Sequence, residues 1–187
     1  MRHFVTLVTL WLRILQLSCH EIFLDFVKLQ DEQLEITSSK KCVSDLKEIK
    51  KGLAGNELWA LSILDTSGKT PPGIIGGNNF WLGRENECNL INNPEMASKV
   101  NVEYRMIYAT HTSQIQFDTK LTKPGLTIGL CLPKDCNDAD ISAMSENIFK
   151  SSFWQNHPII GNVSLLRTKK LKLREHFYRE RSVVILM

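Results

Sequence analysis

Five cysteines are the residues of this sequence best suited to covalent or metal chemistry: Cys19, Cys42, Cys88, Cys131 and Cys136. Zinc is disfavoured because Cys131 and Cys136 have the spacing C-x4-C and no second close Cys/His pair accompanies them. In an exported chain, four cysteines suggest two disulfides. We therefore expect Cys42, Cys88, Cys131 and Cys136 to form two intramolecular bridges and to bind no metal. All three possible pairings stay open.

Other reactive residues do not form a catalytic pattern. The histidines stand at positions 3, 20, 111, 157 and 176, and no G-x-S-x-G, H-E-x-x-H, P-loop or G-x-G-x-x-G motif occurs. His111 falls in a polar stretch and is expected to be a solvated loop residue. The run Gly76 to Asn79 could cradle a phosphate only ahead of a helix, but extended or turning chain follows it. We expect a structural turn there, no catalytic residue and no cofactor, and the missing motifs argue against a small hydrolase.

The N-terminus has the three-part layout of a secretory signal peptide over residues 1–20. A short polar start precedes the almost wholly apolar run Phe4 to Leu17, and small residues suited to cleavage follow. The run is shorter than the about 20 residues that span a bilayer. Cleavage after Cys19 or His20 would leave four cysteines, so we expect a secreted or lumenal protein. Arg13 in the apolar run keeps an uncleaved membrane anchor and a core helix open as alternatives.

Three helices and two longer strands are expected to position the cysteines. Ser44 can cap a first helix, Asn56 a second that buries Trp59, and Asn137 a third. Gly68 is expected to end the second helix. Apolar patterns predict strands near 100–109 and 126–132, joined by a polar excursion. The expected fold class is α+β: a small disulfide-stapled extracellular domain with about three helices and a few short strands.

The composition fits one globular domain with appended segments. The chain has 187 residues, is 43% hydrophobic and carries a net charge of +3, which does not indicate disorder or a nucleic-acid partner. We assign an N-terminal lead segment to residues 21–41, the stapled domain to 42–150 and a divergent basic tail to 151–187. The tail lacks the regular aromatic interleaving of nucleic-acid binders and is expected to be solvated. Within it, Asn162-Val163-Ser164 is an N-glycosylation sequon.

An ordered set of short motifs gives the strongest signal for a family. It runs Cys42-Val-Ser-Asp-Leu, Gly55-Asn-Glu-Leu-Trp59-Ala60, Leu64-Asp65-Thr-Ser-Gly68-Lys69, Pro72-Gly73, Gly77-Asn78, Trp81-Leu82-Gly83, Glu87-Cys88 and Gly129-Leu-Cys131-Leu-Pro133-Lys-Asp-Cys136. This set resembles the N-terminal domain of nose-resistant-to-fluoxetine proteins and covers about half of the chain. The resemblance marks Trp59, Asp65, Gly68, Gly73, Gly77, Asn78, Trp81, Gly83 and Pro133 as structural motif residues.

Two departures from the family pattern stand at Arg105, where family members usually have a cysteine after Tyr104, and near Val163 and Ser164, where a second cysteine is common. If those two family cysteines pair with each other, their joint absence leaves the other four intact.

The resemblance implies a non-catalytic extracellular module that binds a lipophilic ligand or a protein partner. In the family this domain usually precedes a multi-span region resembling acyltransferases, involved in lipid or drug uptake. The alternative is therefore the truncated ectodomain of an acyltransferase-3-like membrane protein, and a membrane is expected only in that case.

Overall fold

The fold is mixed α+β, as predicted, in a computed structural model that describes residues 22–29, 39–74, 77–112, 125–155 and 160–170. Within these ranges the elements are, in chain order, α2 (Ile22–Lys28), α4 (Lys40–Ala54), α5 (Leu58–Thr66), β1 (Phe80–Trp81), α6 (Glu85–Leu90), the 3-10 helix η2 (Pro94–Met96), β2 (Val102–His111), β3 (Gly125–Pro133), α7 (Asp138–Phe149), α8 (Ser152–Gln155) and β4 (Val163–Lys170). The expected signal peptide, residues 1–20, lies outside the described residues.

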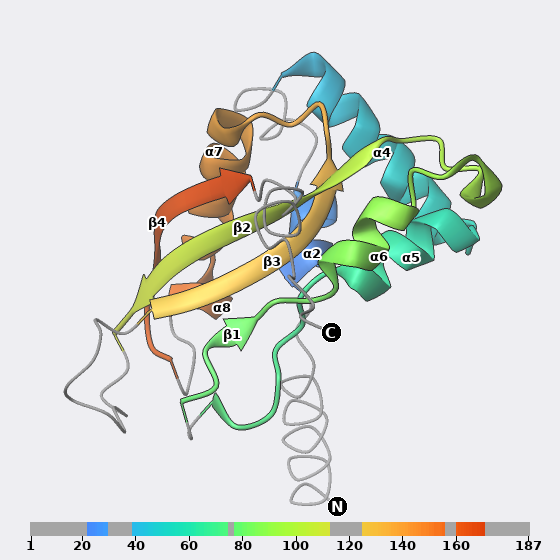
Figure 1. The fold of residues 1–187 in the computed structure, drawn as a ribbon. Helices are drawn as coiled ribbons and strands as arrows, with labels where there is room; N and C mark the ends of the chain where they lie inside the picture. Colours follow the sequence, from blue (N-terminus) through green and yellow to red (C-terminus); the bar gives the residue numbers. More distant parts are fainter. Residues whose placement is uncertain (1–21, 30–38, 75–76, 113–124, 156–159, 171–187) are drawn as a thin grey trace, which may run out of the picture.

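The four strands form one sheet in the order β1-β3-β2-β4 (Figure 1). The long antiparallel pair β2 and β3 is in register from Val102 opposite Pro133 to Thr110 opposite Gly125. The short strand β1 runs parallel to β3, and β4 runs antiparallel to β2. Both strands predicted from the sequence are present. The polar excursion between them falls mostly in 113–124, outside the described residues.

The three predicted helices are present, but two of them begin elsewhere than expected. The first is α4, which is capped by Ser39, whose hydroxyl accepts from the Cys42 N–H at 3.4 Å, so Ser44 is not the cap. The second is α5, whose N-cap is Glu57, because Asn56 has a φ of +53° and turns the chain before the helix. The third is α7, where Asn137 forms the expected cap as part of a capping box with Asp140.

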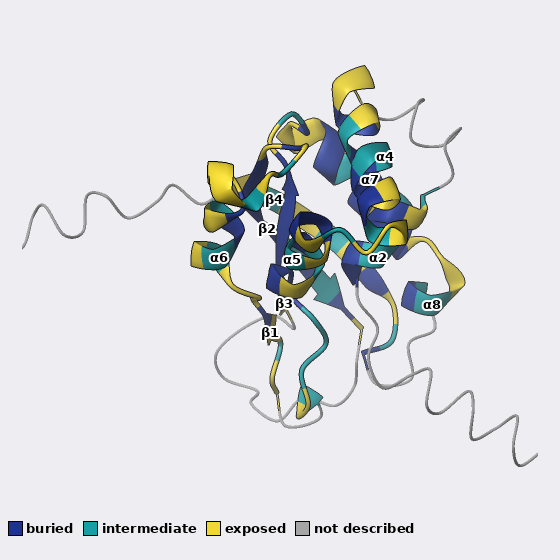
Figure 2. Ribbon diagram, turned by 90° about the vertical axis from the view of Figure 1, so that its right-hand side faces the viewer, coloured by how far each residue is buried: buried dark blue, intermediate teal, exposed yellow. Residues whose placement is uncertain are grey.

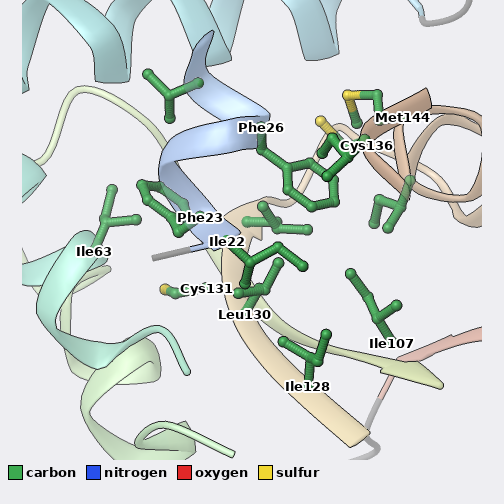
Figure 3. Packing of buried hydrophobic residues seen from close by; sticks show 14 of the residues in the cluster. Ile22, Phe23, Phe26, Ile63, Ile107, Ile128, Leu130, Cys131, Cys136 and Met144 are labelled. Carbon is green, nitrogen blue, oxygen red and sulfur yellow. The ribbon is translucent and has the colours of Figure 1, made fainter. Parts of the chain in front are cut away.

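The segment treated as a lead contributes a helix to the core. Ile22, Phe23 and Phe26 of α2 are at most 1% exposed. Figure 3 shows their side chains pointing between α5, the sheet and α7, with Ile63 on one side and Met144 on the other. The assignment of 21–41 to a separate lead was therefore wrong for α2, which completes the core against helices that come later in the chain.

The basic tail also enters the fold. Residues 163–170 form β4, which pairs with β2 and packs against α7, so this part of the expected solvated tail belongs to the sheet. Pairing with β4 also explains His111, which lies opposite Val163 and is only 7% exposed. The expectation of a solvated loop histidine was wrong, and burial lowers the pKa of His111. Residues 171–187 lie outside the described part of the chain.

Candidate functional site

Two disulfide bridges fix the frame of the domain. Cys42 of α4 bonds to Cys136, just before α7, with 4.6 Å between the Cα atoms. Cys88 of α6 bonds to Cys131 of β3, with 5.6 Å between the Cα atoms. All four side chains are fully buried. The prediction of two bridges is confirmed, and both are long-range: Cys131 and Cys136 are close in sequence but take separate partners.

Trp59 belongs to the contact between α4 and α5. Its side chain is buried, as predicted, and its indole Nε1 donates to the Glu57 carboxylate at 2.5 Å. Hydrogen bonds from Lys99 and Trp59 hold the pKa of Glu57 below its usual value. Gly52 lies against the indole ring, and a Cβ there would stand 2.6 Å from ring carbon Cζ2. The absence of a side chain at Gly52 therefore lets α4 and α5 approach each other closely.

Three glycines of the motif set mark a crossing of three backbone segments. A Cβ on Gly68 would lie 1.9 Å from the Trp81 carbonyl oxygen and 2.8 Å from that of Gly129. The Gly68 N–H donates to the Gly129 carbonyl at 2.6 Å. Gly83, with a φ of +63°, would bring a Cβ within 2.4 Å of the Thr66 carbonyl oxygen. The chain after α5, the end of β1 and the middle of β3 can meet here only as bare backbone.

Tyr104 closes this crossing from β2. Its hydroxyl donates to the Leu82 carbonyl, and a Cβ on Gly129 would lie 1.8 Å from the hydroxyl oxygen. Burial raises the pKa of Tyr104 to about 12, so the hydroxyl stays protonated and remains a donor at ordinary pH. The sequence pattern placed Tyr104 in a strand and next to a missing family cysteine, but it did not predict this role.

The described part of the glycine- and asparagine-containing segment before β1 turns the chain, as expected for Gly76 to Asn79, and Gly76 itself lies outside the described residues. Gly73 and Gly77 have φ angles of +87° and +88°. The Asn78 side chain donates to the Pro72 carbonyl at 3.1 Å, and its backbone N–H donates to the Gly73 carbonyl at 3.1 Å. The short strand β1 follows this turn, and its Trp81 is buried against Trp154 at 6.1 Å between ring centroids.

The other motif residues also lie at ends of elements. α5 ends at Thr66, and the Asp65 carboxylate near this end pairs with Lys69 at 3.3 Å. Pro133 ends β3, and its carbonyl accepts from the Cys136 N–H at 3.1 Å, which turns the chain toward α7. The motif set is thus a set of backbone and packing contacts around the two bridges.

A surface groove between α5 and α6 is a candidate binding feature of the described residues. It has a volume of about 380 Å³ and is lined by Leu58, Leu61, Ser62, Asp65, Thr66, Glu87, Leu90, Ile91 and Met96. Leu58 and Leu90 are 70% and 56% exposed, although each is a large apolar side chain. Figure 2 shows exposed residues on both helices of this side. The sequence signal that could have indicated this groove is that α5 has apolar residues on its solvent-facing side as well as on its buried side. Leu58 and Leu61 are exposed, whereas Trp59 between them is buried.

A comparison with protein-family models identifies the family of the disulfide-bridged domain. The family model of the nose resistant-to-fluoxetine protein, N-terminal domain, matches residues 42–145, which is more than half of the chain. The chain belongs to this family. The match begins at the first bridged cysteine and includes both bridges, the glycine crossing and the groove. Neither the curated proteins nor the solved structures yield a match.

This nose resistant-to-fluoxetine domain has a buried ionic cluster at Arg105. The guanidinium lies 2.5 Å from the Asp138 carboxylate, pairs with Glu103, and donates to the Cys136 carbonyl at 3.2 Å. Lys170 of β4 pairs with the second oxygen of Glu103. Arg105 and Glu103 are 6% and 8% exposed, whereas the Asp138 and Lys170 side chains are 60% and 51% exposed. The cluster therefore joins β2, β4 and the start of α7 through a buried pair with exposed partners at its edge.

The sheet register bears on the two missing family cysteines. Arg105 lies opposite Lys170, whereas Val163 lies opposite His111. Cysteines at 105 and near 163 would therefore not face each other in this register. The ionic cluster makes a connection between β2 and β4 at position 105 that involves no sulfur.

Two further kinds of feature are absent from the described part of the chain. No helix there is long and apolar enough to cross a membrane. Over the same residues, no group of three His, Cys, Asp or Glu side chains could hold a metal ion.

Proposed function

We propose that this domain is a non-catalytic extracellular module that binds a small lipophilic ligand in the groove between α5 and α6. The observation that carries the proposal is the solvent exposure of Leu58 and Leu90 across an open groove of about 380 Å³. Small-molecule sites typically enclose about 300–1,000 Å³ and combine an apolar lining with a few polar groups. The groove falls in this range.

The rim favours a ligand without negative charge. Asp65 and Glu87 are the charged residues of the lining, and both are acidic. Lys69, which follows α5, pairs with Asp65, and Arg84, the N-cap residue of α6, pairs with Glu87. The groove therefore keeps no excess positive charge for an anionic head group. We therefore expect a neutral or basic head group to be preferred over a carboxylate of the same chain length.

Export into an oxidising compartment is part of the proposal. Two buried disulfides are typical of exported domains, and membership of the family agrees with an extracellular position. A binding role rather than catalysis is supported by the use of the motif residues, since the glycine crossing, Trp59 and Pro133 all act on packing and chain direction.

The test is a titration of the refolded, oxidised chain with dodecanol, dodecylamine and dodecanoate, measured by calorimetry. We expect dodecanol or dodecylamine to bind and dodecanoate to bind at least tenfold more weakly. Leu90→Ser should abolish binding, because Leu90 lines the groove and is largely exposed. Leu166→Ser is the matched control: Leu166 is 62% exposed but lies on β4, outside the groove lining.

Absence of binding by all three amphiphiles would contradict the lipophilic-ligand proposal. An equal loss of amphiphile affinity in Leu90→Ser and Leu166→Ser would contradict binding in the groove between α5 and α6. The ectodomain alternative leaves the same groove in place and is tested separately, by mapping the native transcript beyond the codon for Met187.

A further inference from the structure

Asn162 was selected from the sequence, and neither the groove nor the contacts around the two bridges use it. It belongs to the only N-x-Ser/Thr sequence of the chain, Asn162-Val163-Ser164. We propose that Asn162 carries an N-linked glycan at the end of the sheet farthest from the groove. The proposal shares with the binding function only the premise that the chain is exported.

The geometry of the sequon leaves the acceptor accessible. Asn162 is exposed and stands in a bend just before β4 begins at Val163. Its backbone is held by Thr112: the Asn162 N–H donates to the threonine hydroxyl at 2.9 Å, and the Thr112 N–H donates to the Asn162 carbonyl at 3.1 Å. These hydrogen bonds use the backbone of Asn162. Its side-chain amide therefore projects from a fixed position at the surface.

The rest of the sequon divides between core and surface. Val163 is 1% exposed and anchors β4, whereas Ser164 is exposed, with its hydroxyl 2.9 Å from that of Thr110. Because successive side chains of a strand point to opposite faces, burying the middle residue of the sequon turns the Ser164 hydroxyl outward. The hydroxyl that a sequon requires is thus on the surface beside the acceptor.

The position of Asn162 keeps a glycan away from the groove. Val163 lies opposite His111 at one end of β2, and Asn92, just after α6, bonds to Val102 at the other. The ten residues of β2 span roughly 30 Å at about 3.3 Å per residue. A glycan at Asn162 would cover the loop end of β2 and the start of the edge strand β4, and it would leave α5 and α6 accessible.

The experiment is expression of the full chain in secreting animal cells, followed by peptide N-glycosidase F treatment in ¹⁸O water and peptide mapping. We expect a mobility shift on treatment and ¹⁸O-labelled aspartate at position 162. Asn162→Gln and Ser164→Ala should each abolish the shift, whereas Ser164→Thr, which preserves the sequon, should retain it.

Thr110→Ala is the matched control for Ser164→Ala. Both variants remove the hydroxyl contact between positions 110 and 164, but only Ser164→Ala removes the sequon. Loss of the shift in Ser164→Ala together with its retention in Thr110→Ala would establish modification at this sequon. An unmodified Asn162 peptide from the wild-type chain, in medium or in cells, would overturn the proposal. That result would leave amphiphile binding by the refolded chain unaffected.

Discussion

Two positions of this domain require glycine for different physical reasons. Gly68 has no room, because a Cβ would lie 1.9 Å from the Trp81 carbonyl oxygen. Gly77 has room, because nothing would lie within 4 Å of its Cβ, but its φ of +88° is one that other L-residues rarely adopt. The two positions therefore separate steric clash from backbone strain.

We expect Gly68→Ala to lower the free energy of unfolding by about 3 kcal/mol or more, since carbonyl groups cannot rotate away as a side chain can. Gly77→Ala should cost only about 1–2 kcal/mol, the usual strain of a left-handed L-residue. Urea unfolding followed by tryptophan fluorescence measures both. Equal midpoints for the two variants would contradict the close crossing of backbone segments at Gly68.

Residue types predicted the chemistry of the cysteines but not their partners. Oxidation follows from an exported chain and from the four cysteines that remain if the signal peptide is cleaved after Cys19 or His20, both of which the sequence suggests. The partner of Cys131 depends on where α6 packs against β3, and no local pattern encodes that. His111 was misassigned for a similar reason, because its burial depends on β4, more than 50 residues later.

At the scale of elements, β4 is held to the domain by its ladder with β2 and by the charges around Arg105. Glu103 and Arg105 alternate with Tyr104 on β2 and therefore point to the same face, where Lys170 and Asp138 meet them. A buried carboxylate that loses its cation remains costly, which makes this cluster sensitive to removal of a single member.

Arg105→Ala should lower the free energy of unfolding by about 3–5 kcal/mol, because Glu103 would remain buried with only Lys170 as its cation. The double variant Glu103→Gln/Arg105→Met should recover a large part of this loss, since it removes both charges. Amide hydrogen exchange of β4 provides the local readout. Unchanged protection of Val163 to Lys170 in Arg105→Ala would show that the cluster does not hold this strand.

The sequence predicted the long elements better than their ends or their neighbours. The strands β2 and β3 and the helix α7 have strong apolar patterns and, for α7, a complete capping box. The start of α4 was predicted too late in the sequence, at Ser44, because the actual N-cap, Ser39, lies before Cys42. The strand β4 was missed because a run of basic residues is typical of a solvated tail. In the sheet one of these residues, Arg167, lies over the Tyr108 ring, with its Cζ 4.7 Å from the ring centroid.

For the whole molecule, the two disulfides form nested loops. The outer bridge joins residues 94 apart, and the inner bridge joins residues 43 apart. Closing the inner loop shortens the outer one to an effective length of about 51 residues. In the chain-entropy description, each bridge then contributes about 4 kcal/mol when the other is present.

We expect the paired variants Cys42→Ala/Cys136→Ala and Cys88→Ala/Cys131→Ala to lose similar stability, about 4 kcal/mol each, despite their different sequence separations. Removing all four cysteines should leave no folded protein at room temperature. Urea midpoints give the energies, and peptide mapping of the non-reduced wild type verifies the pairing. A linked peptide joining Cys131 to Cys136 would contradict the connectivity on which both values rest.

The nested connectivity also sets the order in which native bonds become possible during synthesis. Of the four bridged cysteines, Cys42 and Cys88 are the first to emerge from the ribosome, and they are not partners in the native structure. At about 5–20 residues per second, roughly 2–9 s pass before Cys131 follows Cys88. Throughout that interval the bond these two can form is a wrong one. A cell that makes this domain must therefore delay oxidation or supply an isomerase that exchanges an early Cys42–Cys88 bond for the native pair.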